Sequence, residues 1–224
     1  MKRHLLIAAI LLQLPLRDFL QTGYSVLYKS VDKDLPAFMG KPQTGYSRLV
    51  CNDTLSFYYF FPGRKDPMKE SKEYGSKVFH HSVLINLREN REYSGVTYQL
   101  PPGKWCYVTD SVRTENWNFT TETKMIAGYL CKKAFLTKEI RIKTDSINYS
   151  VLTDTATAWY AGEIKWPFGP SIYHGLPGLV LEVFDQRFYG RHITAESIIK
   201  EKVAIMIPDG IPVRTTREFF EKRK

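Results

Sequence analysis

Short runs of alternating apolar and polar residues recur along most of this chain, and turn-forming residues separate them. Aromatic residues make up 14% of the sequence, and the runs add valine, isoleucine and threonine, which favour strands over helices. No window shows the apolar spacing of a long amphipathic helix. The pattern therefore predicts a series of short strands. They cover residues 24–29, 46–50, 55–61, 78–87, 91–99, 105–109, 116–122, 129–136, 140–143, 155–160, 179–184 and 192–199.

The end of the chain carries the best helical signal. Thr215 or Thr216 can cap a helix over residues 217–222, where acidic residues precede basic ones, as the helix dipole favours. No internal repeat or linker-like stretch divides the chain. The sequence therefore predicts one mainly β domain over residues 23–224. We expect an antiparallel half-open barrel or curved sheet with a short C-terminal helix.

The first residues have the composition of an export signal. Lys2 and Arg3 precede an apolar run over residues 5–12, which is too short to span a bilayer. We assign residues 1–22 to a signal peptide, with cleavage between Leu20 and Tyr24. No later run is apolar for long enough to cross a membrane. The mature protein is therefore expected to be exported and to have no transmembrane segment.

The formal net charge of the chain is +9. A basic balance can indicate binding to nucleic acid or to an anionic membrane surface. The basic residues form no stripe interleaved with aromatic residues, so the charge is better explained by a solvated surface. No nucleic-acid partner is expected.

The chain has three cysteines, and an oxidising compartment permits one disulfide between them. We expect Cys106 and Cys131 to pair, which leaves Cys51 as a free thiol. In a plain meander their strands would lie roughly 10 Å apart, beyond a disulfide reach of about 7 Å. The bond therefore requires the 116–122 strand to leave the sheet or to pair elsewhere. A bond from Cys51 to either partner, or three buried thiols, are the alternatives.

A turn motif, Gly175-Leu176-Pro177-Gly178-Leu179, stands directly before the apolar run at 179–184. Pro177 fixes its own φ and biases Leu176 toward extended geometry. A type II turn would place Gly178 at positive φ. Without a side chain at Gly175, an aromatic ring could lie against the backbone. The motif favours a rigid structural corner over a binding site. The rings considered for this contact are Trp159, Trp166 and Tyr173.

Three blocks follow one another in the second half of the chain. They are NWNFTTETKMIAGYLCKKA at 116–134, AWYAGEIKWPFGP at 158–170 and HGLPGLVLEVFD at 174–185. Together they resemble the GLPGLI family of exported proteins from Bacteroidota, although Val180 replaces the last letter of the motif. The resemblance implies a periplasmic or outer-membrane-associated location, often with genes for TonB-dependent receptors nearby. It implies no catalytic mechanism. The block order is also similar to half-barrels of the LolA lipoprotein-carrier kind.

The resemblance and the aromatic richness lead us to expect a non-enzymatic envelope protein. It would bind a hydrophobic or peptide ligand, or an outer-membrane TonB-dependent transport partner, in an aromatic-lined concavity. The sequence contains no serine-hydrolase elbow, zinc-protease motif or phosphate-binding loop, and neither a cofactor nor a metal is expected. The candidate ligand-binding residues are Trp159, Tyr160, Trp166, Tyr173 and His174.

Two other classes of function remain open. A hydrolase could use Glu163 or Asp185 together with His174 for acid–base chemistry. A metal-binding protein could use His174, His192 and Cys131 as ligands. One observation separates these two hypotheses from that of a binding protein. It is whether His174, Glu163 and Cys131 converge around a cleft.

Overall fold

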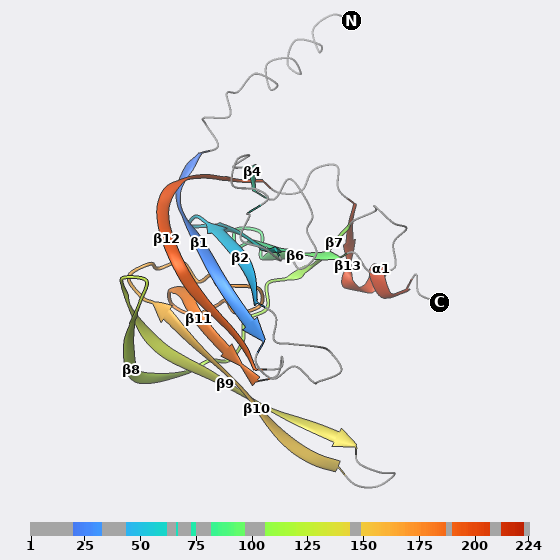
Figure 1. Cartoon of the computed structure of the whole chain (residues 1–224). Coiled ribbons are helices and arrows are strands. Elements are labelled where there is room, and N and C mark those ends of the chain that lie inside the picture. Colours follow the sequence, from blue (N-terminus) through green and yellow to red (C-terminus); the bar gives the residue numbers. More distant parts are fainter. Residues whose placement is uncertain are drawn as a thin grey trace, which may run out of the picture.

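The computed structural model describes residues 20–32, 44–61, 66, 73–74, 82–96, 106–143, 149–186, 190–206 and 212–221. These residues form an open, mostly antiparallel sheet and one short helix, α1 (Thr216–Glu221), as Figure 1 shows. The mainly β prediction is confirmed. The strands are β1 (Gln21–Asp32), β2 (Thr44–Cys51), β3 (Leu55–Phe61), β4 (Glu73–Tyr74), β5 (Val83–Asn86), β6 (Arg91–Val96), β7 (Cys106–Ser111), β8 (Asn118–Ile126), β9 (Tyr129–Lys143), β10 (Tyr149–Ala161), β11 (Leu179–Asp185), β12 (Arg191–Ile205) and β13 (Val213–Thr215).

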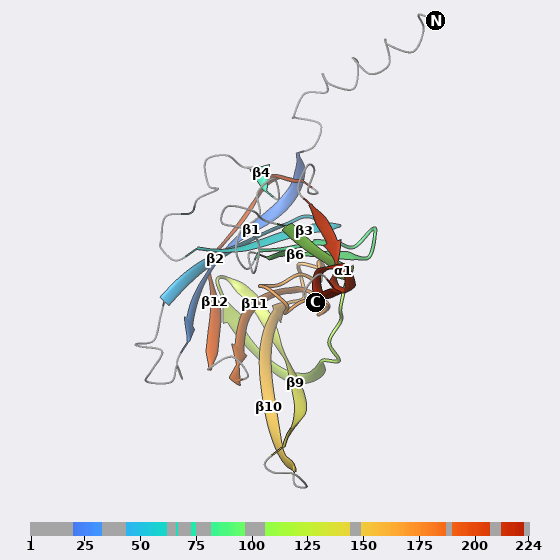
Figure 2. The same ribbon diagram turned by 90° about the vertical axis from the view of Figure 1, so that its right-hand side faces the viewer.

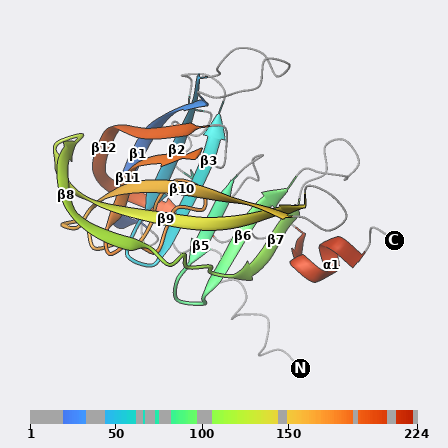
Figure 3. The same ribbon diagram turned by 90° about the horizontal axis from the view of Figure 1, so that it is seen from below.

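Two wings of the sheet enclose the main core. The strand order is β13-β7-β6-β5-β3-β2-β1-β12-β11-β10-β9-β8, so β1 and β12 join the two wings. Apolar side chains from both wings, among them Leu49, Ile85, Ala158 and Val183, belong to one buried cluster. Seen from below, β9 and β10 cross β5 and β6 (Figure 3). The sheet is therefore curved into a half-barrel around these side chains, and Figure 2 shows the same curvature from the side.

The aromatic strand β3 is buried on both of its faces. Tyr58 belongs to the main core, whereas Phe57, Tyr59 and Phe61 lie in a second buried cluster together with Leu84. Side chains alternate between the faces of a strand, so consecutive aromatic residues supply both clusters. The prediction for residues 55–61 agrees with the observed strand.

The strands at one end of the sheet are longer than predicted. Residues 129–136 and 140–143 belong to the single strand β9, because its pairing with β10 continues from Cys131↔Ala161 to Lys143↔Tyr149. This hairpin projects from the rest of the sheet in Figure 1. The end strand β8 is joined to β9 by Ala127 and Gly128, both at positive φ (47° and 87°). Such a pair is typical of a two-residue type I′ hairpin turn.

The motif at 175–179 forms a corner, but its geometry differs from the prediction. The Gly178 N–H donates to the Leu176 carbonyl at 2.8 Å, which makes a three-residue turn centred on Pro177. The fixed φ of proline suits this inverse γ-turn. Positive φ occurs at Gly175 (84°) and not at Gly178, so the predicted type II turn is wrong. Gly178 is required for another reason, since a Cβ there would lie 2.4 Å from the Ala161 carbonyl oxygen.

The loop that contains this corner closes one end of the main core. Phe168, Tyr173 and Leu176 are buried within the core cluster. A hydrogen bond joins the two ends of this loop, because the N–H of Leu179 donates to the Ile164 carbonyl at 3.0 Å. None of the three predicted rings supplies the atoms nearest to a Cβ built at Gly175, which all belong to Thr114.

The predicted disulfide between Cys106 and Cys131 is wrong in this structure. All three cysteines are free and buried. Cys106 lies in β7, the second strand from one end of the sheet order, and Cys131 lies in β9, the second from the other end. The curvature places Cys51 and Cys131 in the main core, where they serve as small apolar side chains.

The helix α1 begins as the sequence predicts. The Thr215 hydroxyl accepts a hydrogen bond from the Glu218 N–H at 3.2 Å, and the Glu218 carboxylate accepts one from the Thr215 N–H at 2.8 Å. This reciprocal pair is a capping box, which makes Thr215 the cap. No helix among the described residues is long and apolar enough to cross a membrane. Residues 1–19 lie outside the described residues, and the signal peptide stays a prediction.

Replacement of Gly178 by alanine should destabilise the protein by roughly 1–3 kcal/mol, the usual cost of overpacking. The added methyl group would collide with the backbone of Ala161. Gly162→Ala is the matched control in the same loop, because its Cβ would lie 4.0 Å from the nearest atom. Urea denaturation monitored by tryptophan fluorescence measures both variants. Equal stability of the two would contradict the close approach at Gly178.

The native protein should contain three free thiols that react slowly with iodoacetamide at neutral pH. Burial raises the pKa of the Cys131 thiol to about 11 and raises the pKa of Cys51 as well. Few thiolates are therefore present at neutral pH, and the thiolate is the reactive form. Mass spectrometry after denaturation without reductant should show all three cysteines labelled. A non-reducing digest that yields a cross-linked peptide would show that a disulfide forms.

Candidate functional site

A polar cavity of about 320 Å³ lies between β6, β7 and the loop that precedes β11. We call it the His174 cavity. The charged and polar side chains on its walls come from three separate stretches of the chain and from the first residue of α1. They are Glu92, Ser94, Asp110, Arg113, Glu115, His174 and Thr216.

Two carboxylates stand directly opposite each other in this cavity. The ladder between β6 and β7 pairs Glu92 with Asp110, and the next pair on the same face is Ser94 with Val108. Directly opposed residues have Cβ atoms about 5 Å apart, and like charges in these positions destabilise a sheet. The contacts that each carboxylate makes with its surroundings therefore determine how the pair is tolerated.

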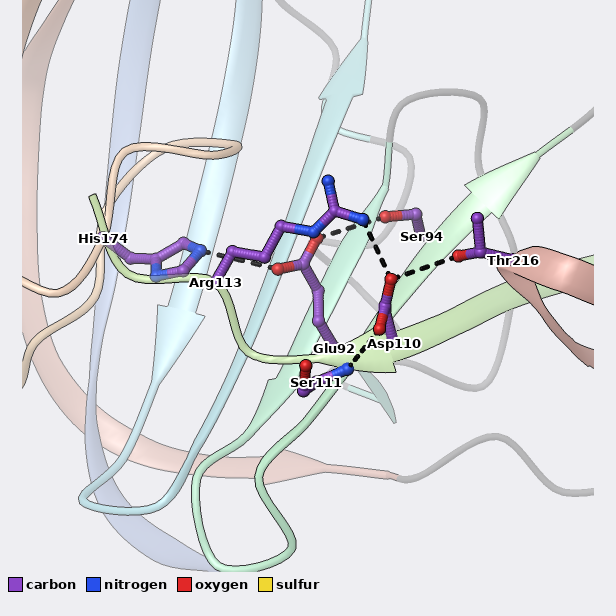
Figure 4. Close-up of polar contacts among 7 residues, drawn as sticks. All are labelled: Glu92, Ser94, Asp110, Ser111, Arg113, His174 and Thr216. Atoms are coloured by element: carbon purple, nitrogen blue, oxygen red, sulfur yellow. Dashed lines mark hydrogen bonds and ion pairs between the residues drawn. The ribbon is translucent and has the colours of Figure 1, made fainter.

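Asp110 is held by three donors. Arg113 Nη2 donates to Asp110 Oδ2 at 2.9 Å, the Ser111 N–H donates to Oδ1 at 2.9 Å, and the Thr216 hydroxyl donates to Oδ2 at 3.3 Å. The hydrogen bond from Arg113 is the main reason that the pKa of Asp110 is lowered. Figure 4 shows Asp110 between Arg113 and Thr216, so this carboxylate connects β7 to α1.

Glu92 has longer contacts than Asp110. Its Oε2 lies 3.5 Å from Nε2 of His174, and its Oε1 lies 3.4 Å from the Ser94 hydroxyl (Figure 4). An ionised carboxylate can accept about four hydrogen bonds. Glu92 therefore keeps acceptor capacity toward the cavity, although its side chain is mostly buried.

The loop fixes His174 between the core and the cavity. The neighbouring Tyr173 points the other way, and its hydroxyl donates to Oδ2 of the buried Asp185 at 2.7 Å. The indole N–H of Trp117 donates to the His174 carbonyl at 3.3 Å. The imidazole is itself buried, so its position is set by packing on both sides of the loop.

The structure separates the five residues predicted to bind a ligand. His174 lines the cavity. Trp166 packs edge-on against Tyr24 with ring centroids 5.1 Å apart, and Tyr160 packs against Phe119 at 6.2 Å. The remaining two residues also contact other parts of the protein. Tyr173 donates a hydrogen bond to Asp185, and the ring of Trp159 lies against Lys124, whose Nζ is 4.3 Å from the ring centroid.

The residues proposed for a hydrolase or a metal site also do not converge. Asp185 accepts from Tyr173 rather than contacting His174, and Glu163 is exposed in the turn after β10. His192 lies 3.4 Å from Glu182, in a network with Lys124 on the β11–β12 side of the molecule. Among the described residues, no group of three or more histidine, cysteine or acidic side chains could hold a metal ion.

Burial alone would raise the pKa of Glu182, but hydrogen bonds from His192 and Lys124 outweigh it and leave the pKa lowered. Lys124 Nζ lies 2.6 Å from Glu182 Oε1. This network joins β8, β11 and β12, and Lys124 and His192 both contact Glu182 within it. Its position suggests a structural contribution rather than a site open to a ligand.

Sequence reasoning missed Glu92, Asp110 and Arg113. They lie in the half of the chain that the recognised blocks do not cover, and no spacing links them to His174 in the sequence. One local signal was present, because acidic residues interrupt the otherwise strand-like runs 91–99 and 105–109 or follow them directly. Their proximity to His174 depends on the curvature of the sheet.

A larger hollow of about 750 Å³ adjoins the His174 cavity. It lies between α1 and the end of the β6–β7 ladder. Asp110 and Thr216 line both spaces, so the contact between these two residues forms their shared wall.

Residues 117–182 match the model of a family described as "Protein of unknown function (Porph_ging)". No curated protein matches the chain. Two solved structures of PNGF-II, in space groups C2 and P21, share the fold with TM-scores of 0.59 and identities of 20% and 19%. They cover 91% and 90% of this chain, which corresponds to only 32% and 33% of the PNGF-II chain. The likeness concerns the fold. The family match begins at Trp117, ends at Glu182 and includes the loop that carries His174.

The pKa of Asp110, measured by NMR, should lie below the ordinary aspartate value and should rise in Arg113→Gln. Arg113 stabilises the charged carboxylate, so its removal makes protonation easier. Arg217→Gln is the control, since Arg217 pairs with Glu221 instead. A carboxylate whose pKa is lowered in the fold stabilises it above the unfolded pKa and loses this effect as the pH falls through the folded pKa. An unchanged Asp110 titration in Arg113→Gln would contradict the contact.

Proposed function

We propose that this chain is an exported envelope protein of the GLPGLI type that binds a peptide-like ligand in the His174 cavity without transforming it. Export is supported by the signal-like composition of residues 1–22. Membership of the GLPGLI type is supported by the three sequence blocks. All three overlap residues 117–182, the region that matches an uncharacterised family. A periplasmic or outer-membrane-associated location and a TonB-dependent transport partner are supported by the resemblance alone.

The opposed carboxylates carry the proposal for the ligand. Three carboxylates (Glu92, Asp110 and Glu115) line the cavity against the single guanidinium of Arg113, in a chain whose formal net charge is +9. A like-charged pair across a ladder acts against stability, and such local conflicts are expected at functional sites. The cavity therefore favours a cationic group, such as a lysine side chain or an amino terminus.

The dimensions and the rim of the cavity suit a peptide. Its volume of about 320 Å³ lies at the lower end of the range for ligand pockets, which is about 300–1,000 Å³. Ile172 lies at its edge and is 40% exposed, so an apolar contact is available beside the polar interior. The aromatic residues expected to receive a hydrophobic ligand pack against other side chains instead, which favours the peptide over a lipid.

Binding is favoured over covalent catalysis by the contacts of His174. Its imidazole contacts Glu92, and no hydroxyl or thiol of the described residues forms a hydrogen bond with it. A nucleophile activated by a base needs such a contact. Glu92 and His174 consequently act as a polar wall rather than as part of a catalytic triad.

Isothermal titration calorimetry with capped Ala-Lys-Ala and capped Ala-Gln-Ala tests the proposal. The lysine peptide should bind, and Glu92→Gln should weaken it by about tenfold or more, the effect of losing a hydrogen bond to a charged group. Glu92→Gln also relieves the repulsion from Asp110, so the variant should remain folded. Glu122→Gln is the control, because this residue pairs with Lys133 outside the cavity. Equal affinity for the two peptides would refute the proposal.

A further inference from the structure

The larger space between α1 and the end of the β6–β7 ladder has a different character from the His174 cavity. We call it the α1 hollow. Its volume is about 750 Å³. Asn90, Arg91, Thr109 and Ser111 line it on the side of the sheet, and Phe220 lines it on the side of α1.

Thr109 presents a buried hydroxyl without a partner in this wall. The residue is 7% exposed, and its Oγ1 has no hydrogen-bond partner among the described residues. Thr109 lies opposite Tyr93 in β6 and beside Thr215 in β13, so its backbone is held by strands on both sides. Buried hydroxyl groups are nearly always hydrogen-bonded, and an exception at the wall of a cavity requires an explanation. Rotation of the Thr109 side chain would turn this hydroxyl toward the hollow, where a ligand would supply the missing partner.

Arg91 supplies the uncompensated charge of this wall. It is exposed at the start of β6, opposite Ser111, and it forms no ion pair within the described part of the chain. The other charges around the hollow are paired internally. Arg217 contacts Glu221 at 2.6 Å, and Asp110 contacts Arg113 at 2.9 Å.

We propose that the α1 hollow binds a carboxylate group. The Arg91 guanidinium balances its charge, and the hydroxyl groups of Thr109 and Ser111 and the amide of Asn90 donate hydrogen bonds to its oxygens. A single negative charge matches the single unpaired guanidinium. A phosphate dianion is disfavoured, because the carboxylates of Asp110 and Glu221 also border the hollow. The ring of Phe220, which is 51% exposed, packs against the apolar part of the ligand beside its carboxylate.

The carboxylate could come from the C-terminus of a peptide or from a free organic acid. Calorimetry with the full chain compares acetyl-Ala-Ala, its C-terminal amide and propionate. Acetyl-Ala-Ala should bind at least tenfold more tightly than its amide. If propionate binds as tightly as acetyl-Ala-Ala, the carboxylate alone is recognised and a free acid suffices. If the peptide binds more tightly, the source is a peptide C-terminus. Both results support the site.

Two variants and a matched control locate the binding. Thr109→Val and Arg91→Gln should each weaken acetyl-Ala-Ala binding by about tenfold. Ser47→Ala is the control, because Ser47 also carries a buried hydroxyl but lines neither space. It should leave the affinity unchanged. Thr109→Val should not lower the thermal midpoint, since the hydroxyl it removes makes no hydrogen bond in the protein.

Several outcomes would overturn the site. They are the absence of binding by acetyl-Ala-Ala, equal affinity for the acid and its amide, equal effects of Thr109→Val and Ser47→Ala, or an unfolded Thr109→Val. The probe carries no cation, so Glu92→Gln should not affect its binding. Failure of the α1 hollow is therefore distinguishable from failure of the His174 cavity.

Discussion

Gly178 lies so close to the backbone of Ala161 that a Cβ atom would be 2.4 Å from the Ala161 carbonyl oxygen. The approach brings the two ends of the loop together, and Leu179 then pairs with Ala161 at the start of the β10–β11 ladder. The intervening residues leave the sheet and return within a short distance. They fold over the open end of the core, where Phe168 and Leu176 are buried. The position of His174 follows from this path.

The His174 cavity is assembled from parts whose positions have separate causes. The ladder between β6 and β7 opposes Glu92 and Asp110, and the segment after β7 supplies Arg113. The loop supplies His174, whose backbone carbonyl accepts a hydrogen bond from the Trp117 indole. Asp110 then connects the cavity to α1 through Thr216. One carboxylate therefore stabilises the wall between two spaces of different charge, one bordered by an excess of carboxylates and the other by the unpaired Arg91.

The aromatic residues have a role that the sequence did not reveal. A large aromatic ring stabilises the fold most where its whole surface is removed from water. Such residues are therefore buried in the core rather than left exposed in a ligand site. Tyr160 and Tyr173 are examples, since both are buried in the main core. The side chains left around the cavities are mostly short, polar or charged, and their chemistry differs accordingly from the aromatic concavity expected at first.

Local pattern determined the features that depend on near neighbours in the chain. Strands β3 and β11 and the Thr215 cap of α1 were predictable because alternation, flanking turns and capping act within a few residues. Tertiary structure decided the rest. The short strand β13 exists because it pairs with the distant β7, and Gly178 is needed because Ala161 lies against it. Cys106 and Cys131 stay apart because their strands lie near opposite ends of the sheet order. Glu92 meets His174 only when the whole sheet curves, since burial of a shared core, rather than any local spacing, chooses which distant residues become neighbours.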